Sequence, residues 1–381
     1  MLRRSAVRFA CLRLVAATCR KGTRWRRSRP ERLLVIRPDH IGDLLLMLPA
    51  LAALRAAWAD WHITLAVGPW VEPLARILPW VDLVEVVPFP GFSRAGNRNL
   101  FAPYALAWQL ARRWRGRFDT CVVARADHWW AAMVVAAAGI PVRVGYATRE
   151  TELFLTHALT RGCWHEVKAN FLLALQVQQE LAPLPEPTVH THPLHLPLPS
   201  WAHQEAERFL SRELGSSTPF LCVHPGAGAP NKLWPVQRYC RLVQQLWKQA
   251  GLPVVVTGSR AESDTVEMVA AACPQAIPMA GELSLPGLAA LFRRSELVIG
   301  ADSGPLHLAI SQGARTLHIF GPADERRYGP WGDPCRNVVV AAELPCRPCG
   351  DLWICRHSVP RACMLAIPSE LVLERAIQLL R

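Results

Sequence analysis

The stretch from residue 297 to residue 322 constrains the fold more than any other part of the sequence, because it contains a complete strand, loop, helix and strand. An apolar run at residues 297–299 predicts a short buried strand, and the polar residues 302–304 predict a loop at the start of a helix. Pro305 fits the first turn of that helix, where a missing N–H is tolerated. A second apolar run at residues 316–320 follows the helix. Two strands joined by a crossover helix are parallel, so the stretch predicts a parallel α/β sheet.

The loop after the first of these strands is a candidate anion site. In parallel sheets, ligands bind beyond the carboxyl ends of the strands, which is where Asp302, Ser303 and Gly304 lie. The N–H groups and the dipole at the start of the following helix favour a phosphate at this position. The alternative is a polar helix cap that binds no ligand, and this stretch alone leaves both interpretations open.

Strands and helices alternate through both halves of the chain, which predicts two α/β domains with doubly wound parallel sheets. A chain of 381 residues is also long for one hydrophobic core. Six prolines between residues 181 and 200 exclude a helix there and predict an extended linker. The expected division is a basic N-terminal tail at 1–30, a first domain at 31–182, the linker at 183–200 and a second domain at 201–381.

Three loops of the second domain each follow a predicted strand and are therefore expected at the same edge of its sheet. The residues of interest in them are Gly226, Ala227, Gly228 and Lys232 in the first loop, Glu262 in the second, and Asp302, Ser303, Gly304, Pro305 and His307 in the third. The first loop begins like a dinucleotide-binding fingerprint, but Asn231 stands where the third glycine belongs, which argues against NAD. A lysine in a glycine-rich loop is typical of phosphate binding.

A single carboxylate is predicted at the edge of the first domain. Residues 32–37 form an apolar strand, Gly42 fits a tight turn, and residues 44–55 form an apolar helix that starts beside Asp43. A carboxylate on one side and an anion site on the other suit a group transfer with a phosphate leaving group. The alternative is that Asp43 only caps the helix.

Basic side chains are concentrated at the N-terminus. Residues 1–30 contain ten basic residues and no acidic one, so the formal net charge of +13 leaves only +3 for the rest of the chain. This distribution favours an anionic membrane surface over a nucleic acid as the partner. Arg8 and Arg13 interrupt the apolar residues of the segment, so neither a signal peptide nor a membrane span is expected, and we expect a cytoplasmic protein. The alternative is that translation begins near the first strand and the segment is not made.

Four of the twelve cysteines lie close together near the C-terminus. Cys346 and Cys349 have the spacing of a metal-ligand pair, whereas Cys355 and Cys363 are further apart in the sequence. Reduced thiols, the usual state in the cytosol, are the favoured interpretation, because the second pair lacks the short spacing of common zinc sites. The alternative is a structural zinc site formed by the four cysteines. Neither interpretation implies a catalytic role.

Three separated segments together resemble the signature motifs of one enzyme family. The segments are Arg37-Pro-Asp-His-Ile-Gly-Asp-Leu44, Gly228-Ala-Pro-Asn-Lys-Leu-Trp-Pro235 and Gly300-Ala-Asp-Ser-Gly-Pro-Leu-His307. In their order and spacing they are similar to segments of the ADP-heptose:lipopolysaccharide heptosyltransferases, glycosyltransferase family 9. The resemblance covers residues 31–381, and the basic tail has no counterpart in the usual family pattern.

The resemblance implies a GT-B fold, in which two Rossmann-like domains face each other across a cleft and a C-terminal helix at residues 369–380 packs near their junction. It implies a metal-independent, inverting transfer of heptose from ADP-heptose to the lipopolysaccharide inner core or its lipid A precursor, with no cofactor. The partners would be this ADP-sugar donor and a lipid-anchored oligosaccharide acceptor. With such an acceptor, the basic tail would hold the enzyme at the inner face of the cytoplasmic membrane.

Roles for individual residues follow from their positions in the motifs. Asp43 would be the general base that takes the proton of the acceptor hydroxyl, and Lys232 would balance the charge of the departing diphosphate. Glu262 would reach the ribose and Leu283 would lie by the adenine. The remaining substrate contacts implied are Gly42, Gly226, Ala227 and Gly228, with Asp302, Ser303, Gly304, Pro305 and His307 at the pyrophosphate and sugar. Preorganised N–H donors and a lysine can stabilise departing ADP without a metal.

Three alternatives stay open. A family 9 transferase with a different nucleotide sugar is the nearest one, because these motifs do not determine the sugar. A non-catalytic nucleotide-binding protein is the second, although the presence of both Asp43 and Lys232 argues against it. A dehydrogenase is the third, and the chain lacks its full glycine fingerprint.

Overall fold

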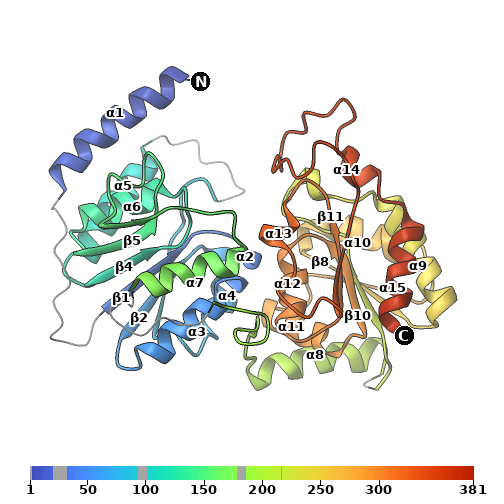
Figure 1. The fold of residues 1–381 in the computed structure, drawn as a ribbon. Coiled ribbons are helices and arrows are strands. Elements are labelled where there is room, and N and C mark those ends of the chain that lie inside the picture. Colours follow the sequence, from blue (N-terminus) through green and yellow to red (C-terminus); the bar gives the residue numbers. More distant parts are fainter. Residues whose placement is uncertain (1, 20–31, 93–100, 178–185, 216) are drawn as a thin grey trace. The chain divides into compact units, whose positions relative to one another are not determined.

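The computed structural model describes residues 2–19, 32–92, 101–177, 186–215 and 217–381 (Figure 1). Side chains are described from Arg8 onward. By internal contacts the chain divides into two compact units: unit 1 is Met1–His40 with Pro49–Pro187, and unit 2 is Ile41–Leu48 with Thr188–Arg381. The chain thus passes from unit 1 to unit 2 within the predicted proline-rich linker.

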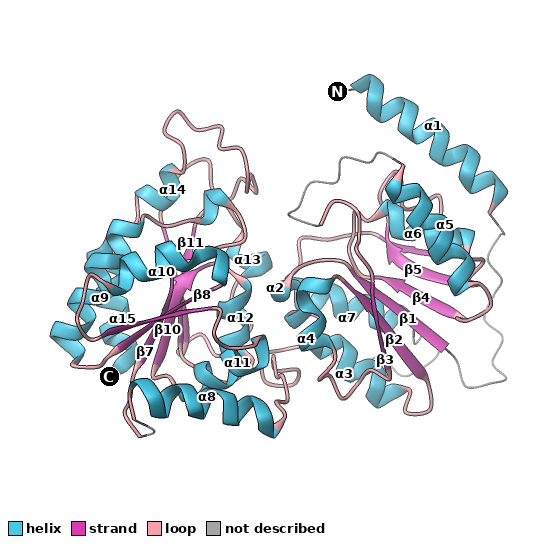
Figure 2. Cartoon of the chain, turned by 180° about the vertical axis from the view of Figure 1, so that it is seen from behind, coloured by secondary structure: helices cyan, strands magenta, loops and turns pink. Residues whose placement is uncertain are grey.

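Unit 1 contains a six-stranded parallel sheet with the strand order β3-β2-β1-β4-β5-β6 and helices on its faces (Figures 1 and 2). Its strands are β1 (Arg32–Arg37), β2 (His62–Val67), β3 (Leu83–Val86), β4 (Thr120–Val123), β5 (Val142–Tyr146) and β6 (His157–Leu159). Its helices are α1 (Leu2–Thr18), α3 (Leu48–Ala57), η1 (Pro69–Val71), α4 (Glu72–Ala75), α5 (Ala102–Trp114), α6 (Trp129–Ala137) and α7 (Glu166–Val177). Residues 33–36 of β1 are fully buried, as expected for a central strand of a parallel sheet covered on both faces.

Unit 2 contains a second six-stranded parallel sheet, with the order β12-β11-β10-β7-β8-β9. Its strands are β7 (Leu221–His224), β8 (Val254–Gly258), β9 (Ala276–Ala280), β10 (Leu297–Ala301), β11 (Thr316–Phe320) and β12 (Asn337–Ala341). Its helices are α2 (Ile41–Leu45), α8 (Ser200–Glu213), η2 (Pro230–Lys232), α9 (Val236–Ala250), η3 (Arg260–Glu262), α10 (Ser263–Ala270), α11 (Leu285–Arg294), α12 (Gly304–Ile310), α13 (Glu325–Tyr328), α14 (Ala362–Leu365) and α15 (Ser369–Leu380). Helices α9, α10 and α15 pack on one face of the sheet and share a hydrophobic core with it.

Both sheets have the same doubly wound topology, since the first strand of each lies between the second and the fourth. The strand order therefore reverses between β1 and β4 in unit 1, where Ile36 is paired with Val123. It reverses between β7 and β10 in unit 2, where His224 is paired with Gly300. This topology confirms the predicted fold class, and ligands of such sheets bind at the two reversal points.

The helix predicted at residues 44–55 is interrupted. The structure has the short helix α2 at Ile41–Leu45 and a separate helix α3 at Leu48–Ala57, with a turn between them. Pro49 explains the break, because proline has no N–H for the helical hydrogen bond and fits only the first turn of a new helix. Asp43 accordingly lies inside α2, in its first turn, and not before the helix.

The N-terminal segment contributes to the folded unit, whereas the sequence predicts that the folded unit begins after residue 30. Leu12 of α1 is only 5% exposed and belongs to the same core cluster as residues of α5 and α6. Arg8 forms an ion pair with Glu150, with 2.9 Å between Nη2 and Oε1. Within the ranges described above, no helix is both long and apolar enough to span a bilayer.

Candidate functional site

An ion pair marks the point where the strand order of unit 2 reverses. Asp302 directly follows β10, and Lys232 ends the short helix η2 in the loop after β7. Lys232 Nζ lies 2.7 Å from Asp302 Oδ2. The Asp302 side chain is 4% exposed and that of Lys232 is 18% exposed, so the carboxylate is enclosed while the lysine stays partly accessible. The structure thus brings together two charged residues that the sequence places on separate loops.

The second loop contacts the glycine-rich loop through Glu262. A Cβ atom on residue 226 would lie 2.2 Å from Glu262 Oε1, so a larger residue at this position would displace the Glu262 carboxylate. The other carboxylate oxygen, Oε2, accepts hydrogen bonds from Ser259 N at 2.9 Å and Ser259 Oγ at 2.6 Å. Glu262 therefore completes a capping box at the start of η3. Its contact with a ribose stays a prediction.

The remaining predicted contacts near these loops, Ala227, Gly228 and Leu283, differ in exposure. Ala227 is half-buried against the hydrophobic core, whereas Gly228 is exposed. Leu283 is half-buried and follows Gly281, which has a φ of +69° and approaches the backbone of Arg260 in η3. Leu283 thus lies in a turn beside the helix that carries Glu262.

Helix α2 packs against α12 at a pair of glycines. A Cβ on Gly304 would lie 2.7 Å from Ile41 Cβ and 3.0 Å from Gly42 N. A Cβ on Gly42 would lie 3.1 Å from Cδ2 of His307. This close approach places Asp43 one residue beyond the contact with the third signature segment. The sequence predicts Asp43 in the first domain, whereas its contacts group it with unit 2.

Two polar side chains of the third loop are buried. Ser303 is the N-cap residue of α12, but its side chain makes no capping hydrogen bond, and its Oγ has no partner among the residues with described side chains. A helix cap therefore does not explain this serine. His307 is 3% exposed, and its ring centroid lies 5.9 Å from that of His318. Burial lowers the pKa of His318, and the charge of His307 lowers it further.

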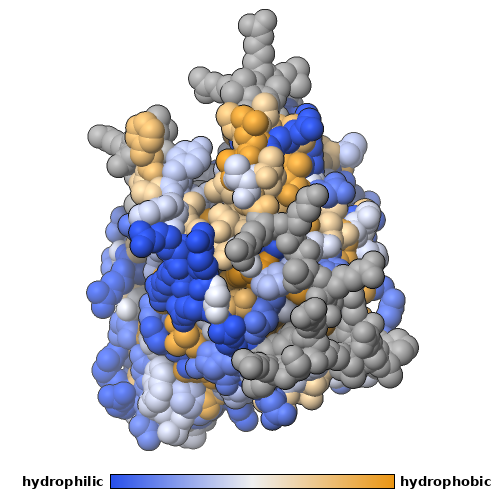
Figure 3. Space-filling view, turned by 90° about the vertical axis from the view of Figure 1, so that its left-hand side faces the viewer, coloured by the Kyte–Doolittle hydropathy of each residue, from blue (hydrophilic) through white to orange (hydrophobic). Residues whose placement is uncertain are grey.

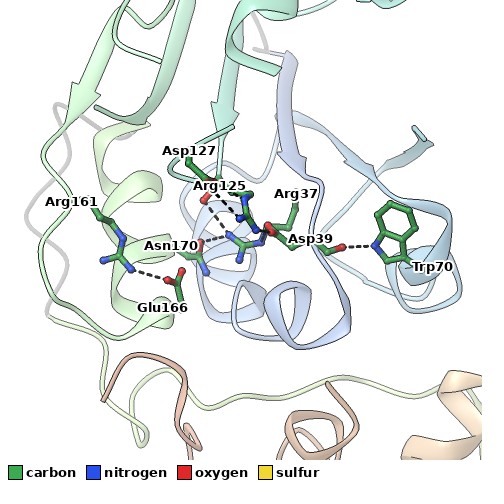
Figure 4. A network of polar contacts seen from close by, with 9 residues as sticks. Arg37, Asp39, Trp70, Arg125, Asp127, Arg161, Glu166 and Asn170 are labelled. Atoms are coloured by element: carbon green, nitrogen blue, oxygen red, sulfur yellow. Dashed lines mark hydrogen bonds and ion pairs between the residues drawn. The ribbon is translucent and has the colours of Figure 1, made fainter. Parts of the chain in front are cut away.

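A polar cluster that is not among the residues predicted from the sequence occupies the corresponding edge of unit 1 (Figure 4). It lies where β1 and β4 end, and we call Arg37, Asp39, Arg125, Asp127 and Asn170 the unit 1 polar cluster. Arg37 Nε is 3.1 Å from Asp39 Oδ2, and Arg37 Nη1 donates to Asn170 Oδ1 at 3.1 Å. Arg125 pairs with Asp39 and with Asp127, the latter at 2.6 Å.

Electrostatics keeps the exposed part of this cluster charged. Burial alone would lower the pKa of Arg125, but the Asp39 charge and the hydrogen bonds to Asp127 and Asp39 raise it overall. Burial would raise the pKa of Asp127, but the hydrogen bond and charge of Arg125 lower it overall. The Arg125 side chain is 39% exposed, with its guanidinium carbon 5.1 Å from the ring centroid of Phe92. Arg125 is therefore a charged, planar group within reach of a ligand.

The sequence contained a partial signal for this cluster. Arg37 and Asp39 belong to the first signature segment and directly follow the first strand. Arg125 and Asp127 follow β4 in the same way, and the parallel pairing of β1 with β4 brings the two loops to one edge. Asn170 on α7 could not be found this way, because its contact with Arg37 spans 133 positions.

The four C-terminal cysteines line one small cavity of about 20 Å³. His357 and Asn231 also line it, but among the described side chains no group of three or more His, Cys, Asp or Glu residues is arranged to hold a metal ion. The zinc site stays an untested alternative to four reduced thiols. Asn231 N donates to Leu352 O at 3.1 Å, and Asn231 Nδ2 donates to Asp351 O at 2.7 Å. The cysteine segment is therefore tied to the residue next to Lys232.

The fold and the two polar sites define a class of protein: an α/β protein with two doubly wound sheets, one of which carries a partly accessible lysine at the point where its strand order reverses. Comparison with known families makes this more specific. Residues 107–352 match the family model described as glycosyltransferase family 9 (heptosyltransferase), which is more than half of the chain. The chain belongs to this family and is a glycosyltransferase.

Individual relatives support the same assignment. The chain is 26% identical over 327 residues to lipopolysaccharide heptosyltransferase 2 of Escherichia coli K12, covering 81% of this chain and 87% of that protein. The solved structure of the E. coli ADP-heptose lps heptosyltransferase II gives a TM-score of 0.69 at 23% identity, over 92% of this chain and 98% of that one. The solved structure of the E. coli heptosyltransferase WaaC with ADP-2-deoxy-2-fluoro heptose gives a TM-score of 0.64 at 18% identity, over 91% of this chain and 99% of that one. These similarities confirm the predicted GT-B fold.

Proposed function

We propose that the protein transfers a heptose from ADP-heptose to the inner core of lipopolysaccharide or to its lipid A precursor. The observation that carries the proposal is the Lys232–Asp302 pair at the reversal point of the unit 2 sheet, beside the helix that holds Asp43. Relatives named as lipopolysaccharide heptosyltransferases, and one solved with an ADP-heptose analogue, support this choice of donor and acceptor.

The donor is assigned to unit 2. A diphosphate carries more negative charge than the Asp302 carboxylate, so it can take over or share Lys232 when the donor binds. The buried hydroxyl of Ser303 is a further candidate donor to the sugar nucleotide, because it lies in the same loop and lacks a described partner.

The proposed reaction is a single displacement at the anomeric carbon. The acceptor oxygen forms a bond to C1 of the heptose while the bond from C1 to the ADP oxygen breaks, which inverts the configuration. Asp43 takes the proton of the acceptor hydroxyl, because an unionised hydroxyl is a weak nucleophile. Lys232 and nearby N–H groups stabilise the charge that develops on ADP, so the step requires no divalent metal.

The acceptor is assigned to unit 1, at its polar cluster. Arg125 is held in one orientation by Asp39 and Asp127 and is the accessible arginine of that cluster. A planar, oriented guanidinium suits a carboxylate or phosphate group of the acceptor. We also propose that residues 1–30 hold the enzyme at an anionic membrane surface, at the inner face of the cytoplasmic membrane, where a lipid-anchored acceptor would be found.

A transfer assay with ADP-heptose and truncated lipopolysaccharide cores tests the function. We expect transfer by the parent protein and a loss of about a hundredfold or more in kcat for Asp43→Asn, with binding of ADP-heptose retained. Asp60→Asn makes the same chemical change at an exposed aspartate and should leave the rate unchanged. Transfer by Asp43→Asn within a fewfold of the parent would remove Asp43 from the mechanism.

The same assay separates the alternatives. Transfer only from another nucleotide sugar would replace the donor, and binding without turnover would indicate a nucleotide-binding protein. Binding of NAD in place of sugar nucleotides would support a dehydrogenase.

Activity should persist in EDTA, whereas activity that disappears in EDTA and returns with magnesium would contradict the metal-independent mechanism.

A further inference from the structure

Helix α5 of unit 1 exposes a row of aromatic side chains. Phe101, Tyr104 and Trp108 are 80%, 61% and 61% exposed. Their spacing of three and four residues places them on one side of the helix. Leu110 and Trp114, on the other side, belong to the hydrophobic core. The aromatic row, which we call the α5 stripe, is therefore not explained by the packing of unit 1.

Basic side chains follow the α5 stripe at the C-terminal end of the helix. Residues 101–118 contain four arginines and no acidic residue. Arg112 lies one helical turn beyond Trp108, with its guanidinium carbon 4.6 Å from the Trp108 ring centroid. Arg112, Arg113 and Arg115 are exposed, and Arg113 and Arg117 pair with the buried carboxylate of Glu85. The accessible end of the stripe is thus cationic.

Helix α1 adds to the same region of unit 1. It lies on the side that carries α5 and α6 (Figures 1 and 2), and Leu12 shares their core cluster. Leu14 is 71% exposed, Val15 is 37% exposed and Arg13 is exposed. Figure 3 views this side of the molecule and shows apolar residues gathered over its upper part. Like α5, α1 contains no acidic residue.

We propose that the α5 stripe inserts into the interfacial region of an anionic lipid bilayer, with the exposed residues of α1 beside it. Tryptophan and tyrosine favour the level of the lipid headgroups, because their rings are apolar and their N–H or O–H groups stay hydrated. Arginines at the edge of the stripe attract anionic headgroups while their aliphatic parts cover apolar surface. The stripe ends in positive charge, which an anionic bilayer attracts and a second copy of the same basic surface would repel. The charge therefore favours a bilayer as the partner. The inference extends the proposed membrane location from the tail to a folded surface.

Vesicle sedimentation tests the α5 stripe with the full-length protein. The probes are vesicles of phosphatidylethanolamine and phosphatidylglycerol, and vesicles of phosphatidylcholine alone, each at low and high salt. We expect Tyr104→Ser/Trp108→Ser to bind anionic vesicles roughly tenfold more weakly than the parent, because two interfacial rings are lost. The difference should persist at high salt, which screens the contribution of the basic tail. Trp201→Ser is the matched control, since Trp201 is 46% exposed on α8 of unit 2.

The outcomes separate this inference from the proposed function. Weaker binding by the double variant, with an unchanged melting temperature and unchanged transfer to a water-soluble acceptor, supports the α5 stripe even if the donor proves to be another sugar. Equal binding by the parent and the double variant overturns it. An equal loss of vesicle binding in Trp201→Ser, or no vesicle binding by the parent, also overturns it. A parent dimer that dissociates in the double variant overturns it as well, because a second copy would then cover the stripe.

Discussion

The ion pair between Asp302 and Lys232 complicates any test of the proposed donor site. The enclosed carboxylate of Asp302 is paired with Lys232, so removing the lysine leaves a buried charge without compensation. A loss of ADP binding in a lysine variant would therefore have two possible causes. A second substitution at Asp302 separates them.

We predict that Lys232→Met weakens ADP binding about tenfold or more and also lowers the free energy of unfolding by about 3 kcal/mol. In Lys232→Met/Asp302→Asn most of the stability should return while ADP binding stays weak. Calorimetric ADP titrations and thermal unfolding of the three proteins measure both quantities. Recovery of ADP affinity in the double variant would show that Lys232 acts only by neutralising Asp302.

His128 provides a prediction about acid stability. Burial lowers its pKa to about 4, and its ring lies among Phe89, Phe92 and Trp130. In the unfolded chain the pKa returns to its ordinary value near 6.5, so between about pH 6.5 and pH 4 only the unfolded state takes up this proton. The free energy of unfolding should therefore fall as the pH drops through this window, by up to roughly 3 kcal/mol from this residue.

Urea unfolding at several pH values measures this effect. His128→Phe should make the dependence between pH 6.5 and pH 4 shallower, whereas His203→Gln, at an exposed histidine, should not. Lowered pKa values of Asp82 and Asp119, each hydrogen-bonded to an arginine, add a further loss of stability at still lower pH in all the variants. The same slope in His128→Phe and the parent would contradict the assignment.

Single residues of the proposed donor site could be singled out in the sequence because each follows an apolar strand in a loop with turn residues. Lys232, Glu262 and Asp302 were recognised in this way. Their mutual arrangement could not be predicted, because the partner of Lys232 is set by the pairing of β7 with β10. The unit 1 polar cluster was missed for the same reason, since it joins loops after β1 and β4 to a residue on α7.

At the level of elements, the strands were the most predictable part. Continuous apolar runs such as residues 33–36 and 297–299 are typical of parallel strands buried on both faces, and the C-terminal helix has the predicted limits. The break between α2 and α3 could have been anticipated from Pro49. The grouping of α2 with unit 2 could not, because it depends on a tertiary contact between two glycines.

This glycine contact leads to a prediction about the element that carries Asp43. In Gly304→Ala, the added Cβ meets Ile41 and the backbone of Gly42 at 2.7 and 3.0 Å, so α2 and α12 must separate. We expect a loss of about 1–3 kcal/mol in stability and a fall in kcat. Gly42→Ala is the milder matched variant, since its Cβ meets only a side-chain atom under 3.4 Å, at 3.1 Å.

Thermal unfolding and transfer rates of the two variants check this expectation. Gly304→Ala should lower the melting temperature and the transfer rate more than Gly42→Ala does, because a side chain can shift more readily than a backbone. Equal rates for Gly304→Ala and the parent would show that this contact does not position Asp43 for the reaction.

At the level of the whole molecule, charge is distributed unevenly along the chain. Ten basic residues lie in the first thirty positions, and the structure places part of that segment, helix α1, on the core of unit 1. Deleting residues 1–30 would therefore remove Leu12 from the core as well as the charges, and a lower membrane affinity would not be attributable to charge alone. Neutralising exposed or terminal arginines avoids this problem.

We predict that replacing Arg3, Arg4 and Arg13 with glutamine weakens binding to anionic vesicles by up to roughly a hundredfold at low salt, since each basic residue near such a surface contributes about 1 kcal/mol. The difference from the parent should shrink at high salt, because the Debye length falls from about 8 Å at physiological ionic strength to about 3 Å at 1 M. Vesicle sedimentation at both salt concentrations measures this, with melting temperatures as the control for folding. A salt-independent difference, or equal binding at low salt, would contradict an electrostatic role for the N-terminal segment.

Because the α5 stripe acts through apolar contact, combining the three arginine replacements with Tyr104→Ser/Trp108→Ser should weaken binding further at low salt and leave only the stripe's effect at high salt.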